Sequence, residues 1–147
     1  RQGLPYLPKA GLDDIAKGAY VLAEPSEVGV TARLQAVIMA TGSEVALAMK
    51  AQEALAHDGI AVRVVSVPST NVFDRQSAAY KASVLPHGVP RIAVEAGVTD
   101  FWWKYGCAAV VGIDTFGESA PAEALFDHFK LTPGNVADTV RVVLARA

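Results

Sequence analysis

The sequence has little cysteine and little charge of either sign. Cys107 is the single cysteine among 147 residues, so no disulfide can form within the chain, and we expect a reducing, cytoplasmic location. Charged residues make up 19% of the chain and the formal net charge is −2, without a basic stripe, so a nucleic-acid partner has no electrostatic support. No apolar run approaches the roughly 20 residues of a membrane-spanning helix, and we therefore expect no membrane partner.

Hydrophobic residues, in contrast, make up 52% of the sequence. A chain of this length and composition can bury a core and is unlike a disordered segment. Because it begins with Arg1 rather than methionine, we expect it to be a piece of a longer polypeptide. Residues 1–18 mix prolines and glycines and are interpreted as a linker or arm from a preceding domain, which leaves residues 19–147 as the domain itself.

Five apolar runs predict the strands of a sheet. They cover residues 19–23, 36–40, 61–67, 91–95 and 109–113. Helical patterns separate the later runs, which predicts a three-layer α/β/α domain with a mostly parallel sheet of about five strands. No helix lies between the first two runs, so the first strand is expected to be an antiparallel edge, pairing with the second.

Four helices are expected between and after these strands. They cover residues 45–57, about 73–83, about 121–129, and the stretch from near 133 to the end. Thr41, followed three residues later by Glu44, fits a capping box at the start of the first helix. The last helix carries Val136, Val140 and Val143 at helical spacing, which predicts one apolar face.

Polar loops follow three of the strands, at the edge where open α/β sheets usually bind ligands. These loops are residues 41–44, 68–70 and 95–97. The helix start at Thr41, Gly42 and Ser43 offers free backbone N–H groups and is a possible anion site, with plain helix capping as the alternative. Glu95 is either an acid or base with a shifted pKa or, as we favour, a structural acceptor of backbone hydrogen bonds. The chain has no glycine-rich phosphate-binding fingerprint.

The remaining candidates favour structural roles. His57, His87 and His128 have no metal-ligand spacing, so we expect surface or helix-end positions and no metal site. Cys107 is interpreted as a small core residue. The aromatic cluster of Phe101, Trp102, Trp103 and Tyr105 is too dense for all four side chains to point inward from one short element, so part of it is expected at an interface.

Several motifs, taken in order, resemble the C-terminal domain of transketolases. The matching segments are Arg1-Gln2-Gly3-Leu4-Pro5, Ala40-Thr41-Gly42-Ser43-Glu44-Val45, Arg63-Val64-Val65-Ser66-Val67-Pro68-Ser69, Phe73-Asp74, Val94-Glu95-Ala96-Gly97, Trp103-Lys104-Tyr105, Thr115-Phe116-Gly117-Glu118-Ser119-Ala120-Pro121-Ala122, Leu125-Phe126 and Asn135-Val136. The series covers nearly the whole chain, and residues 115–122 are its most specific part.

The resemblance implies an enzyme that moves a two-carbon ketol unit between sugar phosphates, in the pentose phosphate pathway, with thiamine diphosphate and magnesium. Such enzymes have three α/β domains per chain and form homodimers. The family's metal–diphosphate motif, a Gly-Asp-Gly with a later asparagine, is absent here. We therefore expect the preceding domains to bind the cofactor, and this chain to support the dimer and the substrate entrance, with no catalytic residue and no ketol transfer on its own.

One substrate-binding position is implied by the resemblance. Arg1 matches an arginine that contacts substrate phosphate in an Arg-Gln-Asn-Leu-Pro segment of the family, and Gly3 replaces the asparagine. Two alternatives stay open at this point. The chain could be a regulatory module that binds nucleotides or anions, or it could be the equivalent domain of another thiamine diphosphate enzyme, such as a 2-oxo acid dehydrogenase or a deoxyxylulose phosphate synthase.

Overall fold

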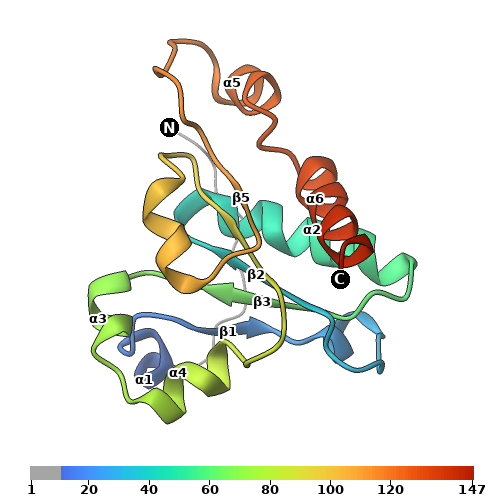
Figure 1. Cartoon of the computed structure of the whole chain (residues 1–147). Helices are drawn as coiled ribbons and strands as arrows, with labels where there is room; N and C mark the ends of the chain where they lie inside the picture. Colours follow the sequence, from blue (N-terminus) through green and yellow to red (C-terminus); the bar gives the residue numbers. More distant parts are fainter. Residues whose placement is uncertain (1–10) are drawn as a thin grey trace.

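A mixed five-stranded sheet forms the centre of the molecule (Figure 1). The computed structural model describes residues 11–147, so Arg1 lies outside the described residues. The strands are β1 (Tyr20–Ala23), β2 (Ala36–Ala40), β3 (Val62–Ser66), β4 (Arg91–Val94) and β5 (Ala109–Val111), and their order across the sheet is β1-β3-β2-β4-β5. The three-layer α/β/α architecture and the five strands are confirmed.

The first strand is the antiparallel edge that the sequence predicts, but its predicted neighbour is wrong. β1 pairs with β3 instead of β2. Both sides of β2 are occupied by parallel strands, with Ile38 opposite Val64 of β3 on one side and Ile92 of β4 on the other. All five residues of β2 are buried, as expected for the centre of a sheet covered on both faces. β1 therefore cannot pair with β2 and pairs with the outer edge of β3 instead.

Helices and 3₁₀ turns surround the sheet. In chain order they are α1 (Leu12–Ile15), η1 (Pro25–Val28), η2 (Gly42–Glu44), α2 (Val45–His57), α3 (Thr70–Asp74), α4 (Ala78–Val84), η3 (Asp100–Tyr105), α5 (Ala122–His128) and α6 (Pro133–Ala145). α2 and α6 pack against one face, while α3, α4 and η3 cover the other. Each face has its own buried cluster, because side chains alternate along every strand.

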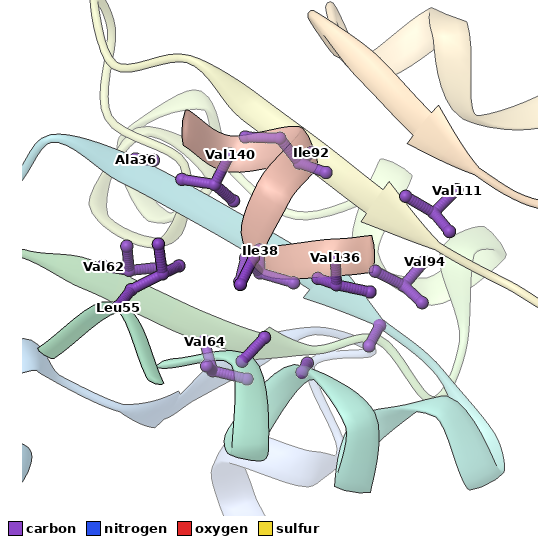
Figure 2. Close-up of a cluster of buried hydrophobic side chains, with 14 of the residues drawn as sticks. Ala36, Ile38, Leu55, Val62, Val64, Ile92, Val94, Val111, Val136 and Val140 are labelled. Carbon is purple, nitrogen blue, oxygen red and sulfur yellow. The ribbon is translucent and has the colours of Figure 1, made fainter. Parts of the chain in front are cut away.

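The face under α2 and α6 is the aliphatic face. Ile38 of β2, Val64 of β3 and Val94 of β4 point into it, together with Val136 and Val140 of α6 (Figure 2). The opposite face is the aromatic face, which holds Val37 and Met39 of β2 together with Phe73, Trp102 and Tyr105. The predicted apolar side of the last helix is confirmed, since Val136, Ala137, Val140 and Val143 are its buried residues.

The helix predicted over about 73–83 is instead two short helices, α3 and α4. The backbone of Ser77 is extended, with φ −59° and ψ 152°, and its hydroxyl accepts a hydrogen bond of 3.1 Å from the Tyr80 N–H. Serine favours this N-cap position because its side chain satisfies a backbone donor that has no partner within the helix. Ser77 therefore starts a new helix instead of continuing the previous one.

Candidate functional site

A crevice opens at the carboxyl ends of β2, β3 and β4, where the sequence places three polar loops. It encloses about 340 Å³ and is lined by Thr41, Val67, Pro68, Ser69, Thr70, Glu95, Phe101 and Trp102. The three predicted loops each contribute to the lining. Parallel pairing of β2 with both of its neighbours explains this convergence, since their carboxyl ends meet at one edge of the sheet.

The predicted capping box at Thr41 and Glu44 does not form. The turn η2 separates Thr41 from α2, and the Thr41 side chain accepts no capping hydrogen bond. The Glu44 N–H donates to the backbone carbonyl of Thr41 at 3.2 Å, while the Ser43 hydroxyl donates to the Glu44 carboxylate. Gly42 has φ +56°, a left-handed value that glycine adopts readily and that closes this tight turn. Glu44 is consequently buried, with 3% of its surface exposed.

Of the three residues proposed as an anion site, Thr41 lines the crevice, whereas Gly42 and Ser43 lie beside it. Their role in binding anions stays a prediction. Glu95 lines the crevice, and burial, followed by the neighbouring Glu44 carboxylate, raises its pKa above the ordinary value. A bound anion would add a further negative group beside these two carboxyl groups. Within residues 11–147, the Glu95 carboxylate accepts no backbone hydrogen bond of the kind predicted. The crevice therefore suits a hydrogen-bond donor better than a negative group.

The aromatic cluster is partly buried and partly exposed, as the density of its side chains predicts. Trp102 and Tyr105 are buried, with 2% and 9% exposure, while Phe101 and Trp103 remain 44% and 49% exposed. A 3₁₀ turn has three residues per turn, so positions 102 and 105 share one side and point to the sheet. The interface role of the outer two rings stays a prediction.

The other candidates occupy ordinary structural positions. His57, His87 and His128 are exposed, and Cys107 is buried in the aromatic face. Burial raises the pKa of the Cys107 thiol to about 11, so it stays protonated and unreactive at neutral pH. Between Gly11 and Ala147 no three His, Cys, Asp or Glu side chains are grouped in a way that could hold a metal ion. None of the helices in these residues has the length and apolar character needed to cross a membrane.

Two polar clusters were not predicted from the sequence. Asp74 accepts hydrogen bonds from Lys104 Nζ at 2.7 Å and Tyr105 Oη at 2.8 Å, which ties η3 to α3. Gln52 is buried in the aliphatic face and donates to the Val62 carbonyl at 2.9 Å. The sequence did single out the segments Phe73-Asp74 and Trp103-Lys104-Tyr105, but it gave no sign that they meet.

Comparison with known proteins decides the family. The model of the transketolase-like C-terminal domain matches residues 18–132. The chain belongs to this transketolase family. Its relatives include Transketolase 1 of Vibrio vulnificus strain YJ016, 47% identical over 150 aligned positions that cover 99% of this chain and 22% of the relative. The chromosomal transketolase of Cupriavidus necator is 51% identical over 138 positions, covering 91% of this chain and 19% of the relative.

Solved transketolase structures have the same fold. The transketolase of Leishmania mexicana superposes with a TM-score of 0.89 at 39% identity, covering 99% of this chain and 20% of that one. A structure described as a split gene transketolase, inactive beta4 tetramer, matches with a TM-score of 0.64 at 25% identity and covers 95% of this chain and 47% of that one. This chain thus spans about a fifth of the length of the curated transketolases it matches.

Proposed function

We infer that this chain is the C-terminal domain of a cytoplasmic transketolase that transfers a two-carbon ketol unit between sugar phosphates, as in the pentose phosphate pathway. The observation that carries this proposal is the alignment of 99% of the chain to a curated transketolase at 47% identity. Because the chain spans only a fifth of such relatives, further domains of the same polypeptide complete the enzyme. The curated transketolases at 47% and 51% identity favour transketolase over the other thiamine diphosphate enzymes.

Thiamine diphosphate and magnesium are assigned to those further domains. The described residues do not fit a metal–diphosphate site, since they hold no group of three His, Cys, Asp or Glu side chains that could bind the metal ion. No chemical step of ketol transfer is therefore assigned to this domain. Its contribution is to support the homodimer and to shape the substrate entrance, with residues 1–18 as the arm from the preceding domain.

An activity assay on matched proteins tests the proposal. The intact polypeptide from its source cell is expected to be several times longer than this chain and to transfer ketol units when thiamine diphosphate and magnesium are supplied. The purified 147-residue chain is expected to show no transfer. Transfer by this chain alone, free of host enzyme, would contradict the assignment of the chemistry to other domains. A native product ending at this length would favour a free-standing module.

Arg1 is the residue proposed to contact substrate phosphate, on the basis of the family motif that it matches. A guanidinium binds phosphate through two parallel hydrogen bonds, and a hydrogen bond to a charged group contributes about 1.5–3 kcal/mol. Arg1→Gln in the intact enzyme is expected to raise KM for a phosphorylated sugar by about 10- to 100-fold. Arg33→Gln is the matched control, because Arg33 is exposed and outside the motif. Equal KM values for the two variants would remove Arg1 from the site.

The alternative is a regulatory anion-binding module at Thr41, Gly42 and Ser43. The crevice beside Thr41 favours it, while the two neighbouring carboxylates oppose it. A calorimetric titration of the intact protein with nucleotides and sugar phosphates distinguishes the anion-binding module from the transketolase domain. Saturable binding that is weakened by Ser43→Ala supports the anion-binding module. If no such binding is found, the module is excluded and the transketolase assignment is retained.

A further inference from the structure

A second pocket lies away from the crevice, between α3, α4 and η3 on the aromatic face. It encloses about 440 Å³ and shares no lining residue with the crevice. Arg91, the first residue of β4, lines it, so the pocket lies toward the amino end of that strand. Its volume is in the range of small-molecule sites, which usually measure about 300–1,000 Å³.

The charged groups that line this pocket are mostly cationic. Lys81, Arg91 and Lys104 contribute three positive charges and Asp74 one negative charge, which leaves two positive charges, and His87 adds a further one when protonated. The Asp74 carboxylate is engaged by Lys104 Nζ at 2.7 Å. Among residues 11–147, neither Lys81 nor Arg91 forms an ion pair. Neither cation is therefore paired directly with a carboxylate in the part of the chain that the structure describes, and the Asp74 carboxylate acts on Lys81 only at longer range.

Backbone carbonyls hold these cations in place without neutralising them. Arg91 donates to the carbonyls of Tyr105 at 2.7 Å and Leu85 at 2.9 Å, and Lys81 donates to the carbonyl of Asp74 at 3.2 Å. These carbonyls lie at the ends of η3, α4 and α3, where helices leave acceptors without partners. A carbonyl carries only a partial charge, so the formal charge of the pocket remains positive. The three hydrogen bonds also fix the cations before any ligand binds.

The floor of the pocket is apolar. Phe73, Leu85 and Tyr105 line it with 1%, 4% and 9% exposure, and the rings of Phe73 and Tyr105 lie 6.1 Å apart. Ala78 and Ala82 of α4 supply small side chains that leave the space open. A positive rim above an aromatic floor complements a small molecule with an anionic group on an apolar ring.

We propose that this pocket binds a small organic anion, a carboxylate or phosphate monoester carried on an aromatic ring, with the anionic group toward Lys81 and Arg91 and the ring over Phe73 and Leu85. This site is separate from ketol transfer and does not rest on the function proposed above. Field lines concentrate in a concave, partly apolar site, which strengthens the attraction between the fixed cations and the anion.

Fluorine NMR titration of the intact polypeptide tests the site with three probes. The anionic probes are 4-fluorobenzoate and 4-fluorophenyl phosphate, and the neutral probe is 4-fluorobenzamide. We expect saturable binding of at least one anion with Kd of about 1 mM or tighter, and at least tenfold weaker binding of the amide. Binding of one anion alone fixes the anionic group as carboxylate or phosphate. Equal binding of the amide, or no binding of either anion, overturns the proposal.

Two variants locate the binding. Lys81→Met keeps the apolar stem but removes a charge, and Ala78→Trp fills the pocket without removing a charge. Each is expected to weaken binding of the anion at least tenfold, with circular dichroism confirming the fold. Lys50→Met is the matched control, because Lys50 is an exposed lysine of α2 on the other face of the sheet. Binding that survives both pocket variants lies elsewhere and contradicts the proposal.

Discussion

The two faces of the sheet are covered in different ways. On the aliphatic face two helices of 13 residues each, α2 and α6, lie over a cluster made of alanine, valine, leucine and isoleucine. On the aromatic face the covering elements are α3, α4 and η3, with 5, 7 and 6 residues. A long helix satisfies most of its own backbone groups and needs only an apolar stripe, whereas a short one leaves most of its terminal groups without partners.

Side-chain hydrogen bonds supply those partners on the aromatic face. Arg63 donates to the carbonyls of Ser83 and Val84 at the end of α4, and Tyr80 Oη of the same helix donates at 2.8 Å to the carbonyl of Ala19, just before β1. The described residues of the aliphatic face show fewer contacts of this kind. Arg141 of α6 donates to the Asp58 carboxylate at the C-cap of α2 at 2.7 Å, and the buried Gln52 donates to the Val62 carbonyl at 2.9 Å. The aromatic face is therefore held by specific contacts as well as by burial, and that arrangement also leaves a charged pocket between its short elements.

The largest expected effect comes from removing the central ring of the aromatic face. Phe73→Ala should lower the free energy of unfolding by about 4 kcal/mol, since the cavity costs packing in addition to transfer energy. Leu55→Ala, its match on the aliphatic face, should cost about 3 kcal/mol. Both side chains are fully buried, with 1% and 0% exposure. Urea denaturation of the two variants beside the parent chain gives the values.

Near-ultraviolet circular dichroism sharpens this comparison. Phe73 lies 6.4 Å from the Tyr80 ring and 6.1 Å from the Tyr105 ring, which in turn packs against Trp102 at 6.0 Å. Phe73→Ala should therefore reduce the aromatic signal of the folded protein, while Leu55→Ala leaves it intact. Loss of the signal in both variants would show that the two faces are not independent.

A second test concerns the backbone approach at Gly18, beside α3. Gly18 has φ +86°, and a Cβ built there would lie 2.4 Å from the Ser69 carbonyl oxygen and 2.5 Å from the Phe73 nitrogen. Gly18→Ala should cost about 3 kcal/mol, from the left-handed conformation and the displacement of α3 together. Gly29→Ala separates the two contributions, because Gly29 has φ +80° with open space around it and should cost about 1 kcal/mol. Thermal denaturation of both variants checks this, and equal losses would mean that α3 moves freely.

The same difference between the faces explains what the sequence could predict. The five strands and α2 were found because each is a run or stripe of apolar residues, and burial follows that pattern directly. The split between α3 and α4, the missing capping box and the partner of β1 depend on single hydrogen bonds and on neighbours distant in the sequence. The convergence of three loops at the crevice followed from topology, whereas the burial of Glu44 against Ser43 depends on the left-handed turn at Gly42.

The smallest effect, and the one that reports on charge, is expected at Asp74. Its carboxylate joins α3 to η3 through Lys104 and Tyr105, but it is 40% exposed, so solvent screens the ion pair. Asp74→Asn should lower the free energy of unfolding by about 1 kcal/mol at pH 7. Asp138→Asn is the control on the aliphatic side, where Asp138 pairs with Arg141 at 71% exposure, and it should change stability by less than about 0.5 kcal/mol.

The pH dependence gives Asp74 a signature of its own. The hydrogen bond from Lys104, helped by that from Tyr105, holds the pKa of Asp74 below its ordinary value, against the opposite effect of burial. A carboxyl group with a depressed folded pKa stabilises the protein above its unfolded pKa of about 3.9, and that contribution is lost as the pH falls through the folded pKa. The stability difference between the parent chain and Asp74→Asn should hence be constant from neutral pH down to about pH 5 and shrink below about pH 4. Urea denaturation at successive pH values measures it. A difference that is undiminished at pH 3 would mean that Asp74 acts through packing rather than through its charge, and the contact between α3 and η3 would then depend on burial alone.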